Sequence, residues 1–212
     1  MPGPHDRIIA TAAKAALGPL NFRQKGRSRV WLADHGWWLT VVEFQPSGWS
    51  KASYLNVAAH WLWGQMGCVS FDFPFGGRLA EHAEYESDQQ FAPAAARLAE
   101  SAAREAQRLL QIVTSLEAAS DVLLREARTV HPGWISYDAG VASGLVGRST
   151  DAAEMFASIL ATPAPPASLL HSAAERMARI VSEPLALQRE VASLIARQRE
   201  ALKLPETTAS PV

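Results

Sequence analysis

The sequence predicts an α+β protein with an N-terminal helix, a three- to four-stranded antiparallel sheet and then a mostly α-helical C-terminal half. Between residues 29 and 63 the chain is rich in β-branched and aromatic residues, which favour strands, and six of its seven tryptophans lie there. From about residue 88 onward, alanine is frequent and apolar residues recur at helical spacing. These patterns predict a sheet domain over residues 1–90, a helical region over residues 91–204 and a disordered tail over residues 205–212.

Each element has a local signal. Asp6 is a suitable N-cap for the first helix, which the Gly18-Pro19 pair ends. Three strand-forming runs follow, separated by turn-forming residues: residues 29–32, 37–45 and 54–62. Residues 68–73 alternate between apolar and polar side chains and predict a fourth strand, which Pro74 and two glycines would end. Helices are expected over residues 93–116, 134–146, 150–160, 167–181 and 183–202, with a shorter helix ending near Arg128.

The second and third strands sort their side chains onto two faces. Pairing them around the loop of residues 46–51 places Gln45 opposite Tyr54. One face is then apolar and should form the core: Trp31, Trp38, Val42, Phe44, Leu55, Val57 and Trp61. The other face is mixed and would carry any polar pocket: Leu39, Val41, Glu43, Gln45, Tyr54, Asn56, Ala58 and His60. A shift of one residue in the register would exchange the two faces.

Composition limits the classes of function. The chain of 212 residues has a formal net charge of −1, so no overall field attracts it to nucleic acid or to an acidic membrane. Its single cysteine, Cys68, excludes an intramolecular disulfide, and we expect a buried thiol. The N-terminus has no apolar signal segment and no stretch is long enough to span a bilayer, so we expect a cytoplasmic protein. No motif predicts a cofactor, and His82, Glu84 and Glu86 lack the full ligand set of a metal site.

Three short motifs follow the first helix: Phe22-Arg23-Gln24-Lys25-Gly26, Val41-Val42-Glu43-Phe44-Gln45-Pro46-Ser47 and Tyr54-Leu55-Asn56-Val57. In this order they resemble a bacterial family catalogued as domain of unknown function 4304, over about residues 6 to 65. The chain departs from the family pattern at Asn21, where glycine commonly precedes the phenylalanine, and at Glu43, where asparagine is common. The resemblance implies an α+β fold and no particular activity.

A basic segment precedes the first long strand. Arg23, Lys25, Arg27 and Arg29 place four cations at alternate positions, and an extended segment would put them on one face with Trp31. Such a row suits a phosphate backbone and a stacked base. The alternative is a solvated edge strand, where basic residues discourage edge-to-edge aggregation. The predicted register turns Arg29 and Trp31 toward the core, which weakens the nucleic-acid interpretation.

Two further candidates lie on the predicted sheet. Trp49 is in a loop of Pro, Gly and Ser, where an exposed indole would anchor a partner and a folded-back one would only cover the sheet. Glu43, Gln45, Asn56 and His60 form the best polar cluster. A carboxylate near an imidazole suits general acid–base work, and a structural hydrogen-bond network is the commoner explanation.

No constellation of residues typical of a catalytic site is present, and the leading hypothesis is a non-enzymatic protein-interaction module. Its partner would be another protein or a second copy of the chain, bound through the mixed sheet face with Gln45, Tyr54 and Asn56, the Trp49 loop and the helical half. Two alternatives stay open. One is a nucleic-acid binder that uses the basic segment Arg23, Lys25, Arg27 and Arg29. The other is a small hydrolase or transferase with Glu43 and His60 as its acid–base pair.

Overall fold

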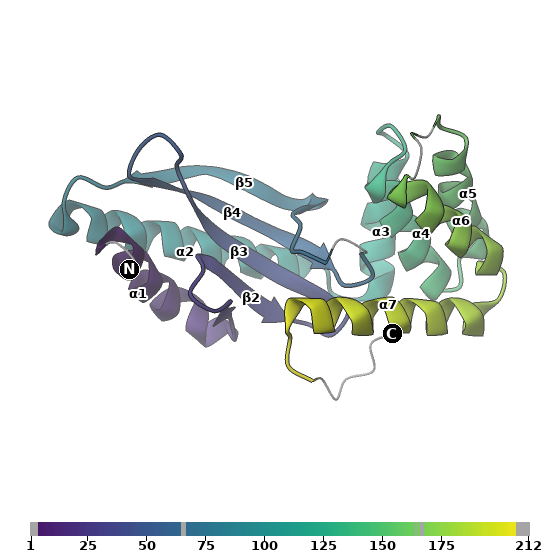
Figure 1. Ribbon diagram of the computed structural model, residues 1–212, viewed down its shortest axis with the longest axis horizontal. Helices are drawn as coiled ribbons and strands as arrows, with labels where there is room; N and C mark the ends of the chain where they lie inside the picture. The colour runs from purple at the N-terminus through teal and green to yellow at the C-terminus, as the bar shows by residue number, and fades with distance from the viewer. Residues whose placement is uncertain (1–3, 65–66, 164, 166–167, 207–212) are drawn as a thin grey trace. The chain divides into compact units, whose positions relative to one another are not determined.

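The strand-forming runs build one sheet. Over residues 4–64, 67–163, 165 and 168–206, which the computed structural model describes, a helix precedes a five-stranded antiparallel sheet and further helices follow it (Figure 1). The predicted α+β class is confirmed, and the sheet has one strand more than the three to four predicted. Of the predicted tail, residues 207–212 lie outside the described residues. Two compact units divide the chain, Met1–His60 with Val69–Gln111, and Trp61–Cys68 with Ile112–Val212.

The first unit contains the sheet, the helices that precede it in the chain and the long helix that follows it. Its elements in chain order are α1 (Pro4–Leu17), the 3₁₀ helix η1 (Gly18–Leu20), β1 (Arg23–Gln24), β2 (Val30–Asp34), β3 (Trp38–Pro46), β4 (Ala52–Trp61), β5 (Asp72–Glu84) and α2 (Asp88–Ile112). The strands follow one another in the sheet in chain order. The unpredicted strand is β1, whose Arg23 and Gln24 pair with Leu32 and Trp31. The long helix α2, which begins the predicted helical region, belongs to this unit.

The last strand differs in position from its prediction. The strand expected over residues 68–73 instead runs from Asp72 to Glu84, through the Pro-Gly region that was expected to end it. β5 lies at the end of the sheet order, and edge strands tolerate residues that interrupt central ones. Gly76 has a φ of 112°, and a Cβ there would lie 2.1 Å from the carbonyl oxygen of Val57. Glycine therefore permits a close approach between β5 and β4 that any other residue would prevent.

One face of the sheet forms the core of the first unit, as the alternation predicts. The predicted apolar set is buried, and its members in this unit are Trp31, Trp38, Val42, Phe44, Leu55 and Val57. Trp61 is also buried and belongs to the second unit. The helices α1 and α2 lie on this side of the sheet (Figure 1) and bury Ile9, Ala13, Phe91 and Leu98. The backbone N–H of Ser47 donates to the Ala52 carbonyl at 2.9 Å, which agrees with the predicted placement of Gln45 opposite Tyr54.

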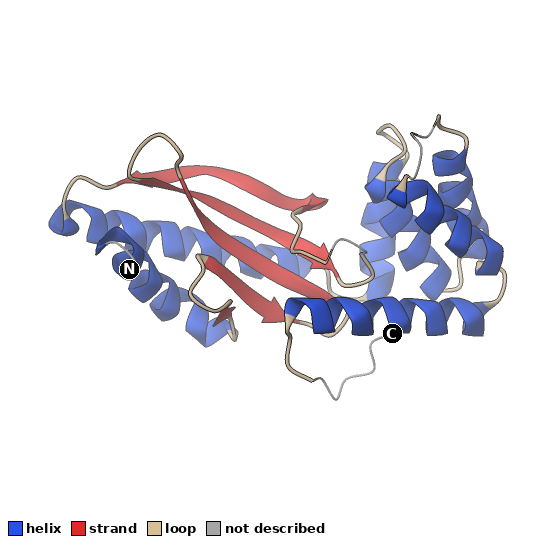
Figure 2. Cartoon of the chain, viewed as in Figure 1, coloured by secondary structure: helices blue, strands red, loops and turns tan. Residues whose placement is uncertain are grey.

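The second unit consists of helices and one short segment (Figure 2). Its helices are α3 (Leu116–Ala127), α4 (Trp134–Leu145), α5 (Ser149–Leu160), α6 (Leu169–Ile180) and α7 (Pro184–Leu202). Hydrogen bonds attach the segment Trp61–Cys68 to them. The Trp63 indole N–H donates to Asp138 in α4 at 2.9 Å, and the Gln198 amide in α7 donates to the Cys68 carbonyl at 3.3 Å. The Cys68 thiol is exposed, not buried as predicted, because this segment is held through its backbone.

Candidate functional site

Polar side chains from three neighbouring strands meet on the second face of the sheet. We call this group the polar half-face. It consists of Glu43 and Gln45 in β3, Tyr54 and Asn56 in β4, and Arg78 and His82 in β5. Farther along the same strands, this face carries the buried side chains of Leu39, Val41 and His60. The face is therefore polar and partly exposed only toward the hairpin that joins β3 to β4.

Asn56 is the centre of the polar half-face. It is 7% exposed, and its amide nitrogen donates to Glu43 Oε2 at 2.9 Å and to Gln45 Oε1 at 3.0 Å. Its amide oxygen accepts from Arg78 Nε at 3.4 Å, and Arg78 Nη2 also donates to Gln45 Oε1. Both amide protons and the amide oxygen of Asn56 are thus engaged, so the network holds four side chains in one arrangement.

Two aromatic rings complete the polar half-face. The Arg78 guanidinium lies over the Tyr54 ring, 4.7 Å from its centroid, in a cation–π contact. The His82 ring stacks near Tyr54, with centroids 5.9 Å apart and planes inclined by 29°. Sequence reasoning did not place Arg78 and His82 on this face, because it ended the last strand at Pro74. The alternation of His82, Ala83 and Glu84 was the signal that would have extended the strand.

The structure does not bring Glu43 and His60 together. Glu43 lies beside Asn56, and His60 is four residues farther along β4, which corresponds to about 13 Å. His60 is 1% exposed, and its Nδ1 accepts from the Ser70 backbone N–H at 3.2 Å. Ser70 Oγ lies 2.8 Å from the same nitrogen. A hydroxyl beside an imidazole suits nucleophilic catalysis, but Nδ1 has one lone pair and the backbone N–H shares it. The two contacts tie Ser70 to the end of β4, which is a structural role.

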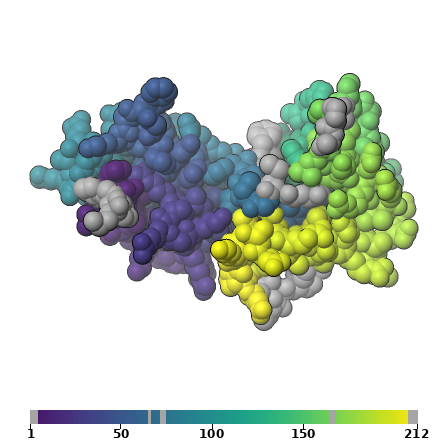
Figure 3. Space-filling model, in the orientation of Figure 1, coloured from purple at the N-terminus to yellow at the C-terminus, as the bar shows by residue number. Residues whose placement is uncertain are grey.

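Trp49 is at the tip of the β3–β4 hairpin and its side chain is 99% exposed. Figure 3 shows the chain near residue 50 as a lobe that stands out from the first unit. Ser47 Oγ accepts from the backbone N–H groups of Trp49 and Ser50 at 3.2 and 3.3 Å. These bonds restrict the turn that carries the indole. The alternative of a loop folded back over the sheet is therefore wrong for Trp49.

The basic segment divides between solvent and core. Arg23, Lys25 and Arg27 are exposed. Arg29 donates to Asp6 in α1 and to Ser53 Oγ at 2.7 Å, and Trp31 is 5% exposed. Since Arg29 and Trp31 both turn to the core side, as the register predicted, the exposed cations have no aromatic ring from this segment beside them.

Other features of the described residues do not add a site. No three His, Cys, Asp or Glu side chains among them are grouped to hold a metal ion. No helix in the described part of the chain is both long enough and apolar enough to cross a bilayer. The cytoplasmic location stays a prediction from the sequence.

Comparison with known proteins identifies no relative: no protein-family model, curated protein or solved structure matches the chain. The resemblance of residues 6 to 65 to the domain of unknown function 4304 therefore stays a prediction. The candidate site rests on the geometry of the polar half-face and of the Trp49 hairpin.

Proposed function

We propose that the chain is a non-enzymatic protein-binding module whose contact surface consists of Trp49 and the polar half-face. The observation that carries the proposal is the exposed indole of Trp49, 99% accessible to water at a hairpin tip. A tryptophan buries roughly 200 Å² when a partner covers it, which corresponds to about 5 kcal/mol of apolar transfer at most. Tryptophan contributes little to stability at this position, and it has much to contribute to binding.

The hairpin supports this role because its backbone is ordered before binding. Ser47 Oγ bonds to two backbone N–H groups of the turn, and the Ser47 N–H bonds to the Ala52 carbonyl at the base of the hairpin. A partner that covers Trp49 therefore has to immobilise one side chain and not a whole loop. Preorganisation of this kind reduces the entropy lost on association.

The polar half-face supplies the residue types that dominate protein interfaces. Arginine, tyrosine and tryptophan are enriched at binding hot spots. Arg78 is exposed, stacked over Tyr54 and bonded to Gln45 and Asn56, so its guanidinium is held in place with donors free for a partner's carboxylate or carbonyl. The strand of Gln45 continues directly into the Trp49 hairpin, so the two parts of the surface share one element.

The alternatives have less support. A nucleic-acid binder would use Arg23, Lys25 and Arg27, yet Arg29 is paired with Asp6 and Trp31 is buried, which removes the fourth cation and the stacking ring. A hydrolase or transferase would use Glu43 and His60, which lie about 13 Å apart along the strands. The binding module needs neither arrangement.

The proposal is tested by photo-crosslinking in the cells that produce the protein. A benzoylphenylalanine in place of Ser50 puts the reactive ketone beside Trp49. We expect a crosslinked species of higher mass that is lost in the Trp49→Ser variant and reduced in Arg78→Gln. Mass spectrometry of the species separates a partner protein from a second copy of the chain.

A matched control is available in the second unit. Leu185 is 72% exposed in α7, so Leu185→Ser removes an exposed apolar side chain elsewhere and should leave the crosslinks unchanged. Trp49→Ser and Leu185→Ser should keep the melting temperature of the parent within about 2 °C, since substitutions of exposed side chains rarely change stability. Equal crosslinking by Trp49→Ser and the parent protein would refute the proposal.

A further inference from the structure

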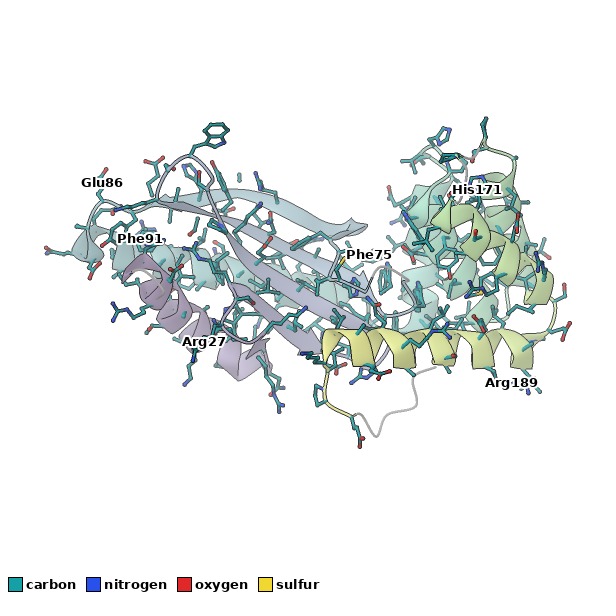
Figure 4. All side chains as sticks on the ribbon, viewed as in Figure 1. Arg27, Phe75, Glu86, Phe91, His171 and Arg189 are labelled. Atoms are coloured by element: carbon teal, nitrogen blue, oxygen red, sulfur yellow. The ribbon has the colours of Figure 1, made fainter. Side chains whose placement is uncertain are left out.

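A cavity lies within the first unit, between α1 and the hairpin formed by β1 and β2. Its volume is about 340 Å³, within the lower range of small-molecule pockets. It is separate from the contact surface proposed above, because none of its lining residues belongs to the polar half-face or to the Trp49 hairpin. Arg27, labelled in Figure 4, marks the hairpin side of this cavity.

The cavity has an apolar floor. Ile9 and Ala10 from α1 and Trp31 from β2 line it, and Ile9 and Trp31 are 2% and 5% exposed. The floor therefore suits a flat apolar body.

The rim of the cavity is cationic. Arg7 and Arg27 line it and are exposed, and no carboxylate among the described residues forms an ion pair with either. Arg29 also lines the cavity, but the Asp6 carboxylate lies 2.5 Å from its guanidinium and balances its charge. Two uncompensated guanidinium groups remain, beside the first turns of α1, where the helix dipole adds a partial positive charge.

The walls of the cavity are ordered without a ligand. In the β1–β2 hairpin, Lys25 N–H donates to the Val30 carbonyl at 2.8 Å. The Gln24 amide donates to the Ser28 carbonyl at 2.7 Å, and Ser28 Oγ donates to the Lys25 carbonyl at 2.6 Å. These three hydrogen bonds fix the backbone of the β1–β2 hairpin, which carries Arg27. Arg7 lies in α1, and the Asp6–Arg29 pair ties α1 to the residue that directly precedes β2.

We propose that this cavity binds a small amphipathic anion, with a flat apolar body on Ile9, Ala10 and Trp31 and a carboxylate held by Arg7 and Arg27. Arginine pairs with a carboxylate through two parallel N–H bonds, which gives direction as well as attraction. Two guanidinium groups at the mouth and an apolar floor favour a molecule with its charge at one end. A neutral molecule of the same shape would contact the apolar floor but would form no ion pair with the arginines of the rim.

The experiment compares two probes of equal size on the full chain by isothermal titration calorimetry. They are 2-naphthoate and its neutral analogue 2-naphthamide. We expect one site per chain, with naphthoate bound at least about fivefold more tightly than naphthamide, as for a partly exposed ion pair. Arg27→Gln should bring the two affinities together. Ala10→Leu, which fills the floor and keeps a good helix former in α1, should weaken both probes by about tenfold or more.

Arg23→Gln is the matched control, because Arg23 is an exposed cation of the same hairpin that does not line the cavity. It should leave both affinities unchanged. Thermal unfolding of each variant confirms that a loss of binding is not a loss of fold. Equal affinity for the two probes, binding unaffected by Ala10→Leu, or no binding of either probe at about 1 mM would overturn the proposal.

Discussion

The Arg29 guanidinium holds the Asp6 carboxylate of α1, with Nη2 at 2.5 Å and Nε at 2.8 Å from Oδ1. Both side chains are mostly buried, at 16% and 29% exposure. Arg29 also bonds to Ser53 Oγ in β4 at 2.7 Å and to the Phe44 carbonyl in β3 at 3.4 Å, so this one cation joins the first helix to two neighbouring strands. The pair explains why the alternating basic segment does not form a single row.

The first prediction follows from this pair. Arg29→Ala leaves a partly buried carboxylate and a buried hydroxyl without their donor, and should lower the free energy of unfolding by about 2 kcal/mol. Arg27→Ala, two residues earlier on the exposed turn, should change it by less than about 0.5 kcal/mol. Urea denaturation of the two variants measures both values. Equal effects would show that the Asp6–Arg29 pair adds nothing to stability.

The second prediction concerns the buried hydrogen bond between Trp63 and Asp138. The indole Nε1 lies 2.9 Å from Asp138 Oδ1 within the second unit. Trp63→Phe and Asp138→Ala each remove this charge-assisted bond, so a double-mutant cycle should give a coupling energy of about 1–3 kcal/mol. Asp138→Asn keeps an acceptor and should be the mildest of the single changes. Additive effects in the cycle would contradict the prediction.

The third prediction concerns the contact between α4 and α5. Gly140 in α4 faces Phe156 in α5, and a Cβ on residue 140 would lie 2.6 Å from Phe156 Cε1. Gly140→Ala gains about 1 kcal/mol of helix propensity and loses more to overpacking, so we expect a net loss of about 1–3 kcal/mol. Thermal or urea unfolding measures the change.

A smaller side chain at residue 156 tests the cause of that loss. Phe156→Leu removes the ring atoms that a Cβ on residue 140 would meet. The double variant should therefore lose less free energy of unfolding than the sum of the losses in the two single variants. Gly48→Ala is the control, because a Cβ on Gly48 meets no atom within 4 Å and its effect should be close to zero. A Gly140→Ala protein as stable as its parent would mean that α4 and α5 can shift apart to accept the added methyl group at no cost in stability.

The fourth prediction is a pH dependence of stability. Burial lowers the pKa of His35 below its usual value of 6.5, and the neighbouring Asp34 carboxylate opposes this only in part. The folded state therefore binds fewer protons than the unfolded state once the pH falls below about 6.5. His35 contributes stability above this pH, and that contribution is lost as the pH falls toward its lowered folded pKa.

The measurement compares the parent with His35→Gln between about pH 8 and pH 5.5. Glutamine keeps a group able to bond with Thr40, whose hydroxyl lies 2.9 Å from His35 Nε2. The free energy of unfolding of the parent should fall more steeply with decreasing pH than that of the variant. Parallel curves would mean that the imidazole is protonated equally in both states.

Local pattern and composition determined the fold class of this protein, the helices after residue 88 and the apolar face of the sheet. They also placed Glu43 beside Asn56, because both lie in a hairpin whose short loop sets the register. These properties depend on side-chain alternation within a strand and on its nearest neighbour along the chain. The same register turned Arg29 and Trp31 toward the core side, although nothing local identified Asp6 as the partner of Arg29.

Only the tertiary structure decided which distant residues meet. Arg78 and His82 join the polar half-face because β5 continues through glycines that a central strand would not tolerate. Glu43 and His60 share a face of the sheet, yet they remain far apart because His60 lies four residues beyond the partner of Glu43 along β4. Trp49 stays in water because no described element packs over its hairpin, and the packing of distant elements is not encoded in any local pattern.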